Sequence, residues 1–97
     1  MDKRIELSGF RDIDEPSLDL VHRNIGNHLR RLEEITKKLE RLHITLKRIH
    51  VKEKSEKYEI HAKLLDDGKP YFAEVTDRNL LAAVDNVLHK VANEIKK

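Results

Sequence analysis

The spacing of apolar residues changes twice along this chain, and no other feature constrains the fold as much. From Leu18 apolar residues recur every three or four positions, the period of a helix with one buried face. Between Leu42 and Val75 they alternate with polar residues, as in half-buried strands. The spacing of three and four returns from Leu80 to Ile95. An α+β fold is therefore predicted, with strands between two amphipathic helices.

Capping and turn residues bound these elements. Asp14-Glu15-Pro16-Ser17 places acidic groups and a proline where the first turn of a helix tolerates them, so a helix is expected from there to about Lys38. Strands are expected at about residues 3–9, 42–51, 58–64 and 70–75. After Lys47 the apolar phase slips to Ile49 and Val51, which indicates a bulge or a strand edge.

Two turns separate the later strands. Lys52 to Lys57 is predicted to be a charged turn, and Asp66-Asp67-Gly68-Lys69 a hairpin loop, because Asp-Gly favours tight turns. Asp77 is expected to cap the final helix. The predicted order is β-α-β-β-β-α in a single domain of residues 1–97. A right-handed helical crossover would make the first two strands parallel, and the resulting four-stranded mixed sheet would carry both helices on one face.

No pair of histidines or adjacent carboxylates in the sequence has the pattern of a catalytic or metal site. The chain lacks cysteine, which excludes disulfides and thiolate ligands. His22 and His28 lie six residues apart in the first helix, and His43 and His50 seven apart in a strand, so each pair points in different directions. No glycine-rich phosphate loop or nucleophile motif is present. We expect no enzyme activity, metal, cofactor or small-molecule substrate.

Basic residues are concentrated in one part of the chain, although the formal net charge is only +2. Residues 22–54 contain ten basic and four acidic side chains, a net charge of +6, whereas residues 1–21 contain three basic and six acidic. This asymmetry indicates a surface that faces a polyanion, with a solvated charged surface of the heat-adapted kind as the alternative. Aromatic residues are few, and Tyr58 and Tyr71 are expected in the core. Folded RNA contacted through its phosphates is therefore favoured over stacked single strands.

Basic residues off the apolar stripes are the candidates for RNA contact. From their positions they are Arg23, Arg30, Arg31, Lys37, Lys38, Lys47, Arg48, His89 and Lys90. Arg30 and Arg31 are the leading pair, because guanidinium groups bind phosphate oxygens in a fork. An equally supported alternative is that they pair with Glu33 and Glu34 along the helix.

Three segments resemble the ribosome hibernation-promoting factor family, also called ribosome-associated inhibitors. Ala82-Ala83-Val84-Asp85 followed by Lys90 is similar to the family's last helix, His28-Leu29-Arg30-Arg31-Leu32-Glu33 to its first helix, and His43-Ile44-Thr45-Leu46-Lys47-Arg48 to its second strand. The similarity extends over roughly residues 4–97. It departs from the family pattern at Asn79-Leu80-Leu81 and at Glu34.

The resemblance implies a fold related in shape to double-stranded RNA-binding domains. It also implies binding to the small ribosomal subunit, through ribosomal RNA in the channel used by messenger and transfer RNA, and silencing of translation. His28 joins the candidate contacts on this basis, and Arg31, Lys90 and either Lys47 or Arg48 match basic positions of the family. The second domain of long members is not seen, so pairing of ribosomes is not expected.

The sequence also predicts where the protein is located and leaves an alternative function open. The N-terminus lacks the apolar run of a secretory signal and no segment approaches the length of a membrane span, so a cytoplasmic protein without a membrane partner is expected. The alternative function is a protein-interaction or regulatory module that does not bind RNA, which the modest net charge and the acidic residues 1–21 and 58–79 support. The oligomeric state stays open.

Overall fold

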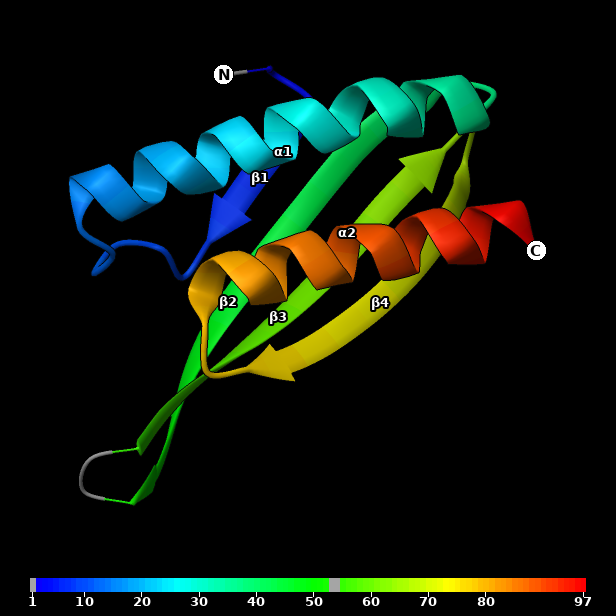
Figure 1. The fold of residues 1–97 in the computed structure, drawn as a ribbon. Coiled ribbons are helices and arrows are strands. Elements are labelled where there is room, and N and C mark those ends of the chain that lie inside the picture. Colours follow the sequence, from blue (N-terminus) through cyan, green and yellow to red (C-terminus); the bar gives the residue numbers. More distant parts are fainter. Residues whose placement is uncertain (1, 53–54) are drawn as a thin grey trace.

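The computed structural model describes residues 2–52 and 55–97 of the chain. Its elements follow the predicted order (Figure 1). They are β1 (Ile5–Ser8), α1 (Glu15–Ile35), β2 (Leu39–Lys52), β3 (Ser55–Asp66), β4 (Lys69–Asp77) and α2 (Leu80–Lys96).

The four strands form one sheet in the order β1-β2-β3-β4. β1 runs parallel to β2, with Leu7 opposite Ile44, and α1 is the crossover between them. β2, β3 and β4 are joined as antiparallel hairpins. Both helices cover the same face of the sheet, as Figure 1 shows, and within residues 2–52 and 55–97 no helix lies on the other face. The predicted α+β architecture is confirmed.

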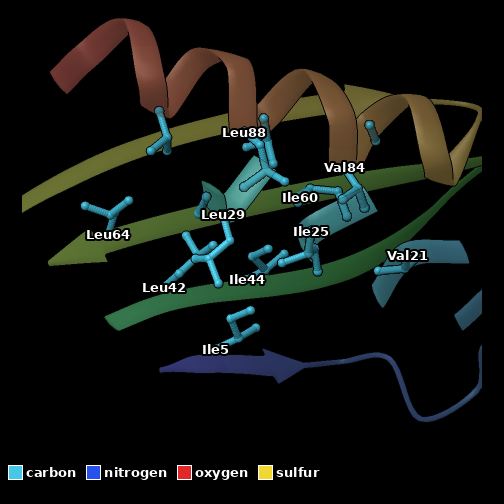
Figure 2. Packing of buried hydrophobic residues seen from close by; sticks show 14 of the residues in the cluster. Ile5, Val21, Ile25, Leu29, Leu42, Ile44, Ile60, Leu64, Val84 and Leu88 are labelled. Atoms are coloured by element: carbon cyan, nitrogen blue, oxygen red, sulfur yellow. The ribbon is translucent and has the colours of Figure 1, made fainter. Parts of the chain in front are cut away.

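The core lies between the helix layer and the sheet (Figure 2). Ile25 of α1, Val84 and Leu88 of α2, Leu42 of β2 and Ile60 of β3 meet there without solvent exposure. Their spacing explains the arrangement, because residues three or four apart share one helix face and alternate residues share one sheet face. Tyr58 and Tyr71 pack at the margin of this core, as predicted.

The first helix ends earlier than predicted, at Ile35 rather than near Lys38. The hydroxyl of Thr36 donates to the carbonyl oxygen of Leu32 at 2.8 Å and closes the last turn. The next two amides, of Lys37 and Lys38, both donate to Oδ1 of Asp66, at 3.0 and 2.8 Å. Asp66 stands at the end of β3. Its carboxylate therefore accepts, through a tertiary contact, the two amides that would have bonded to helix carbonyls if α1 had continued.

The strands β2 and β3 are longer than predicted. β2 begins at Leu39 instead of Leu42 and continues to Lys52, and β3 begins at Ser55. The predicted charged turn is therefore shorter, and its residues 53–54 lie outside the described part. The pairing is regular from Arg41 to His50. One register shift precedes it, between Leu39 and Arg41, and another follows it, between His50 and Lys52, which is later than the slip of the apolar pattern after Lys47 predicted.

The cap of α2 also differs from the prediction. Oδ1 of Asn79, not of Asp77, accepts the amide of Ala82 at 3.0 Å and caps the helix. Asp77 accepts the amide of Asn79 at 2.8 Å, and so shapes the turn that precedes the cap. Aspartate and asparagine both favour the N-cap position. With Asn79 in that position, Leu80 is the first helical residue.

Within the described residues, neither helix combines the length and the apolar character that crossing a membrane requires.

Candidate nucleic-acid interface

An open groove runs between the two helices on the outer side of the helix layer. It measures about 280 Å³ and is lined by Asn24, Asn27, His28, Arg31, Asp85 and His89. Three of the predicted contact residues, His28, Arg31 and His89, therefore come together from two helices that are far apart in the sequence. Arg31 follows His28 by three positions and shares its side of α1.

Asp85 is the centre of the polar contacts in this groove. Its Oδ1 lies 2.7 Å from Nε2 of His28 and accepts Nδ2 of Asn24 at 3.2 Å. Its Oδ2 lies 3.4 Å from Nε2 of His89, and the rings of His28 and His89 meet edge to face with centroids 4.9 Å apart. The hydrogen bonds from His28 and Asn24 hold the pKa of the Asp85 carboxyl below its usual range. The groove therefore contains an anionic carboxylate as well as the guanidinium of Arg31.

Arg23, Arg30 and Arg31 are exposed on α1. In the part of the chain that the structure describes, no carboxylate lies within ion-pair distance of any of the three. Glu33 turns to Arg4 instead, at 3.3 Å. The alternative that Arg30 and Arg31 pair with Glu33 and Glu34 along the helix is therefore not what the structure contains. Their guanidinium groups are available for an external anion.

Lys37, Lys38 and Lys90 lie further from the groove. The two lysines that follow α1 are exposed and their backbones are held by Asp66. Nζ of Lys90 donates to the carbonyl oxygen of Glu74 at 3.3 Å, so this side chain reaches toward β4, on the side of α2 away from α1. The predicted set thus spreads along the helix layer and does not form one compact cluster.

Lys47 and Arg48 are neighbours in a strand and point to opposite faces of the sheet. Arg48 lies on the helix side, where Nη2 donates to the carbonyl oxygen of Asp12 at 3.3 Å and Nε lies 3.4 Å from Glu56. Lys47 follows Thr45 on the open face. The structure therefore separates Lys47 from the other candidates and engages Arg48 in internal contacts.

The prediction missed several residues that the structure makes prominent. Asn24 and Asp85 complete the groove, and the spacing of four between Asp85 and His89 was the one signal for it in the sequence. On the open face Phe72 is 61% exposed, with Nζ of Lys63 5.7 Å from its ring centroid. The assignment of Tyr71 to the core implied this exposure, because the next residue of a strand faces the other way.

The structure belongs to the class of β-α-β-β-β-α folds with a mixed four-stranded sheet and one helix layer. It is similar to a ribosomal subunit interface protein from Coxiella burnetii, with 18% identity, a TM-score of 0.65 and coverage of 95% of this chain and 92% of the other. It is also similar to the Protein Y N-terminal domain of Thermus thermophilus, with 22% identity, a TM-score of 0.57 and coverage of 99% and 97%. At these sequence identities the similarity shows a shared fold. The resemblance predicted from the sequence is therefore confirmed for the fold.

No protein-family model matches the sequence, and the comparison with curated proteins gives no match.

Proposed function

We propose that this protein is a ribosome-associated translation inhibitor of the hibernation type and acts without enzymatic chemistry. In this proposal it binds small-subunit ribosomal RNA in the channel for messenger and transfer RNA, in the cytoplasm. The exposed side of the helix layer faces the RNA, with Arg23, Arg30 and Arg31 on phosphates and His28 and His89 in the groove beside them. Lys37, Lys38 and Lys90 extend the surface on either side.

The observation that carries the proposal is the pair of exposed arginines on α1. Arg30 and Arg31 have no ion-pair partner among residues 2–52 and 55–97, although Glu33 and Glu34 follow them at helical spacing. A guanidinium group held on a rigid helix forms forked hydrogen bonds with phosphate at little conformational cost. The solved structure from Coxiella burnetii, which shares this fold, is described as a ribosomal subunit interface protein. The fold and the free cations thus support the same role.

Co-sedimentation with purified small subunits tests the proposal. The double variant Arg30→Glu/Arg31→Glu should lose at least tenfold in affinity, because it reverses two phosphate contacts and leaves the core untouched. The matched control is Lys47→Glu/Lys63→Glu, which makes the same change of charge on the open sheet face. Unchanged binding by the arginine variant, or an equal loss in both variants, would contradict the assigned surface.

Salt dependence supplies a second measurement. Each phosphate contact releases condensed counterions, so the affinity of the wild-type protein should fall steeply as salt rises. The arginine variant should show a shallower slope, because fewer contacts remain. Binding that does not respond to salt would argue against recognition through phosphates.

The exposed Phe72 favours a second candidate, a protein-interaction or regulatory module that does not bind RNA. The aromatic ring of Phe72 is 61% exposed beside Lys63, and aromatic side chains are enriched where proteins bind one another. If the protein shows no salt-sensitive binding to ribosomal RNA, and Phe72→Ala abolishes its association with a partner in resting cells, this candidate replaces the first.

A further inference from the structure

We propose that His28, Asp85 and His89 form a binding site for a divalent transition-metal ion of the zinc class, which links α1 to α2. The sequence predicted no metal site, because the chain has no cysteine and no two histidines within one element have metal-ligand spacing. The three residues come from two helices, and only the packing of the helices brings them together.

The distances fit such an ion after small movements of the side chains. One ligand atom from each residue can be chosen so that all lie within 4.8 Å of one another. Ligand atoms that share a tetrahedral zinc ion stand roughly 3.3 Å apart, given metal–ligand bonds of about 2.0–2.2 Å. Nε2 of His28 lies 2.7 Å from Oδ1 of Asp85, and Nε2 of His89 lies 3.4 Å from Oδ2, so both imidazoles already stand near the same carboxylate, which must turn for one oxygen to share the ion with both.

The ligands are held by rigid elements. Asp85 and His89 are four residues apart and share one face of α2, and His28 faces them from α1. The buried residues next to them, Val84 and Leu88, anchor α2 in the core. The site therefore requires little ordering of the backbone when an ion binds.

The choice of ligands selects the kind of metal. Two imidazole nitrogens and one carboxylate oxygen suit zinc and similar ions, whereas magnesium and calcium prefer oxygen ligands throughout. Three protein ligands leave a fourth position for water, and the groove opens this position to solvent. His89, whose side chain is 55% exposed, lies at the entrance.

Asn24 holds the carboxylate of Asp85 in place. Its Nδ2 donates to Oδ1 of Asp85, an orientation that the carboxylate imposes because it only accepts hydrogen bonds. Asn24 is therefore a positioning residue for the Asp85 ligand.

Arg31 lowers the expected affinity for the metal ion. It lines the same groove, and its positive charge opposes a cation. We therefore expect the site to bind zinc more weakly than structural zinc sites do, and we expect the protein to fold without the metal.

The test is calorimetric titration of the full 97-residue chain with Zn²⁺ in a buffer that does not bind metals, together with the visible absorption spectrum of the Co²⁺ form. We expect one ion per chain and the absorption bands of four-coordinate or five-coordinate Co²⁺. His89→Ala and Asp85→Asn should each weaken Zn²⁺ binding by tenfold or more. His89 is exposed, so its variant should retain the circular dichroism spectrum of the wild-type protein.

His61→Ala is the matched control. His61 also contacts two carboxylates, Glu59 at 2.8 Å and Glu74 at 3.4 Å, but among the described residues this cluster does not offer three ligand atoms close to one another. Its loss should leave the affinity for Zn²⁺ unchanged. The proposal is overturned by the absence of saturable binding at micromolar Zn²⁺, or by a loss in His61→Ala equal to that in His89→Ala. No ribosome is needed for this measurement, so its outcome is independent of the proposed function.

Discussion

Asp66 shows how one side chain sets the end of a helix. It is buried, with 8% of its surface exposed, and one carboxylate oxygen accepts the amides of Lys37 and Lys38. Replacement by alanine would leave two amides at the end of α1 without their acceptor. Such a loss costs about 1–3 kcal/mol for each group that stays buried.

We therefore predict that Asp66→Ala lowers the free energy of unfolding by about 2 kcal/mol, measured by urea denaturation. The control is Asp67→Asn, because asparagine tolerates the left-handed backbone of that position, where φ is 48°. A change of less than about 0.5 kcal/mol in Asp66→Ala, the size typical of surface substitutions, would show that water replaces the carboxylate.

Gly26 is the glycine of the first helix. It lies inside α1, is exposed, and an added Cβ would have no heavy atom within 4 Å. No internal packing requires a glycine at this position, so Gly26→Ala should stabilise the protein by about 0.5–1 kcal/mol, because alanine loses less conformational freedom in a helix. Chemical denaturation measures the gain. A more stable variant that binds ribosomes poorly would identify Gly26 as a point of close approach to the RNA.

Gly9 is the contrasting case. Its φ is 84°, and an added Cβ would collide with the carbonyl oxygen of Leu46. Gly9→Ala should therefore be destabilising in the same assay, and equal behaviour of the two glycine variants would contradict both assignments.

At the scale of elements, the start of α1 depends on a charged cap. Oδ2 of Asp14 accepts the amide of Ser17 at 3.1 Å, and this hydrogen bond holds the pKa of the Asp14 carboxyl below its ordinary value of 3.8. A carboxyl whose pKa is lowered by folding stabilises the native state above its unfolded pKa. That contribution is lost as the pH falls through the folded pKa.

The variant Asp14→Asn tests this cap. Asparagine also caps helices but does not titrate, so wild type should be the more stable protein near pH 7, and its advantage should shrink as the pH falls below about 4. Urea denaturation midpoints at several pH values measure the difference. An advantage that persists unchanged to pH 2 would show that the charge of Asp14 plays no part.

β2 has different roles on its two faces. Leu42, Ile44 and Leu46 bury one face under the helices, and the side chains of His43 and Thr45 occupy the other. Because of this alternation, Lys47 and Arg48 lie on opposite faces of the sheet. A charge reversal at Lys47 therefore serves as a control in the binding experiment, because it leaves the charge of the helix layer unchanged.

At the scale of the whole molecule, stability depends on the contact between the helix layer and the sheet. Leu88 has no solvent exposure and lies among residues of the sheet and both helices (Figure 2). Leu88→Ala should cost about 2–5 kcal/mol, through lost burial and the cavity left behind. That is a large fraction of the roughly 5–15 kcal/mol by which domains are stable.

Thermal and chemical unfolding measure this cost. Leu20→Ala is the matched control, because Leu20 is 44% exposed on the same helix layer and its truncation should change stability by less than about 0.5 kcal/mol. Similar losses in the two variants would mean that the packing in Figure 2 is not the main source of stability.

The amino-acid sequence by itself determined the order of elements and the faces that they bury. These follow from local repeats of two and of three to four residues, which chain geometry alone translates into strands and helices. The hairpin at Asp66-Asp67-Gly68-Lys69 was predicted from the turn preference of Asp-Gly, and Asp67 and Gly68 have the positive φ that such a turn requires.

Only the tertiary structure decided the boundaries and the candidate sites. The end of α1 depends on Asp66, which lies 28 and 29 residues beyond the amides that it accepts. The groove depends on His28 and Asp85, which are 57 residues apart. Periodicity carries no information about such distant pairs, because their contact depends on how two helices pack side by side on one sheet.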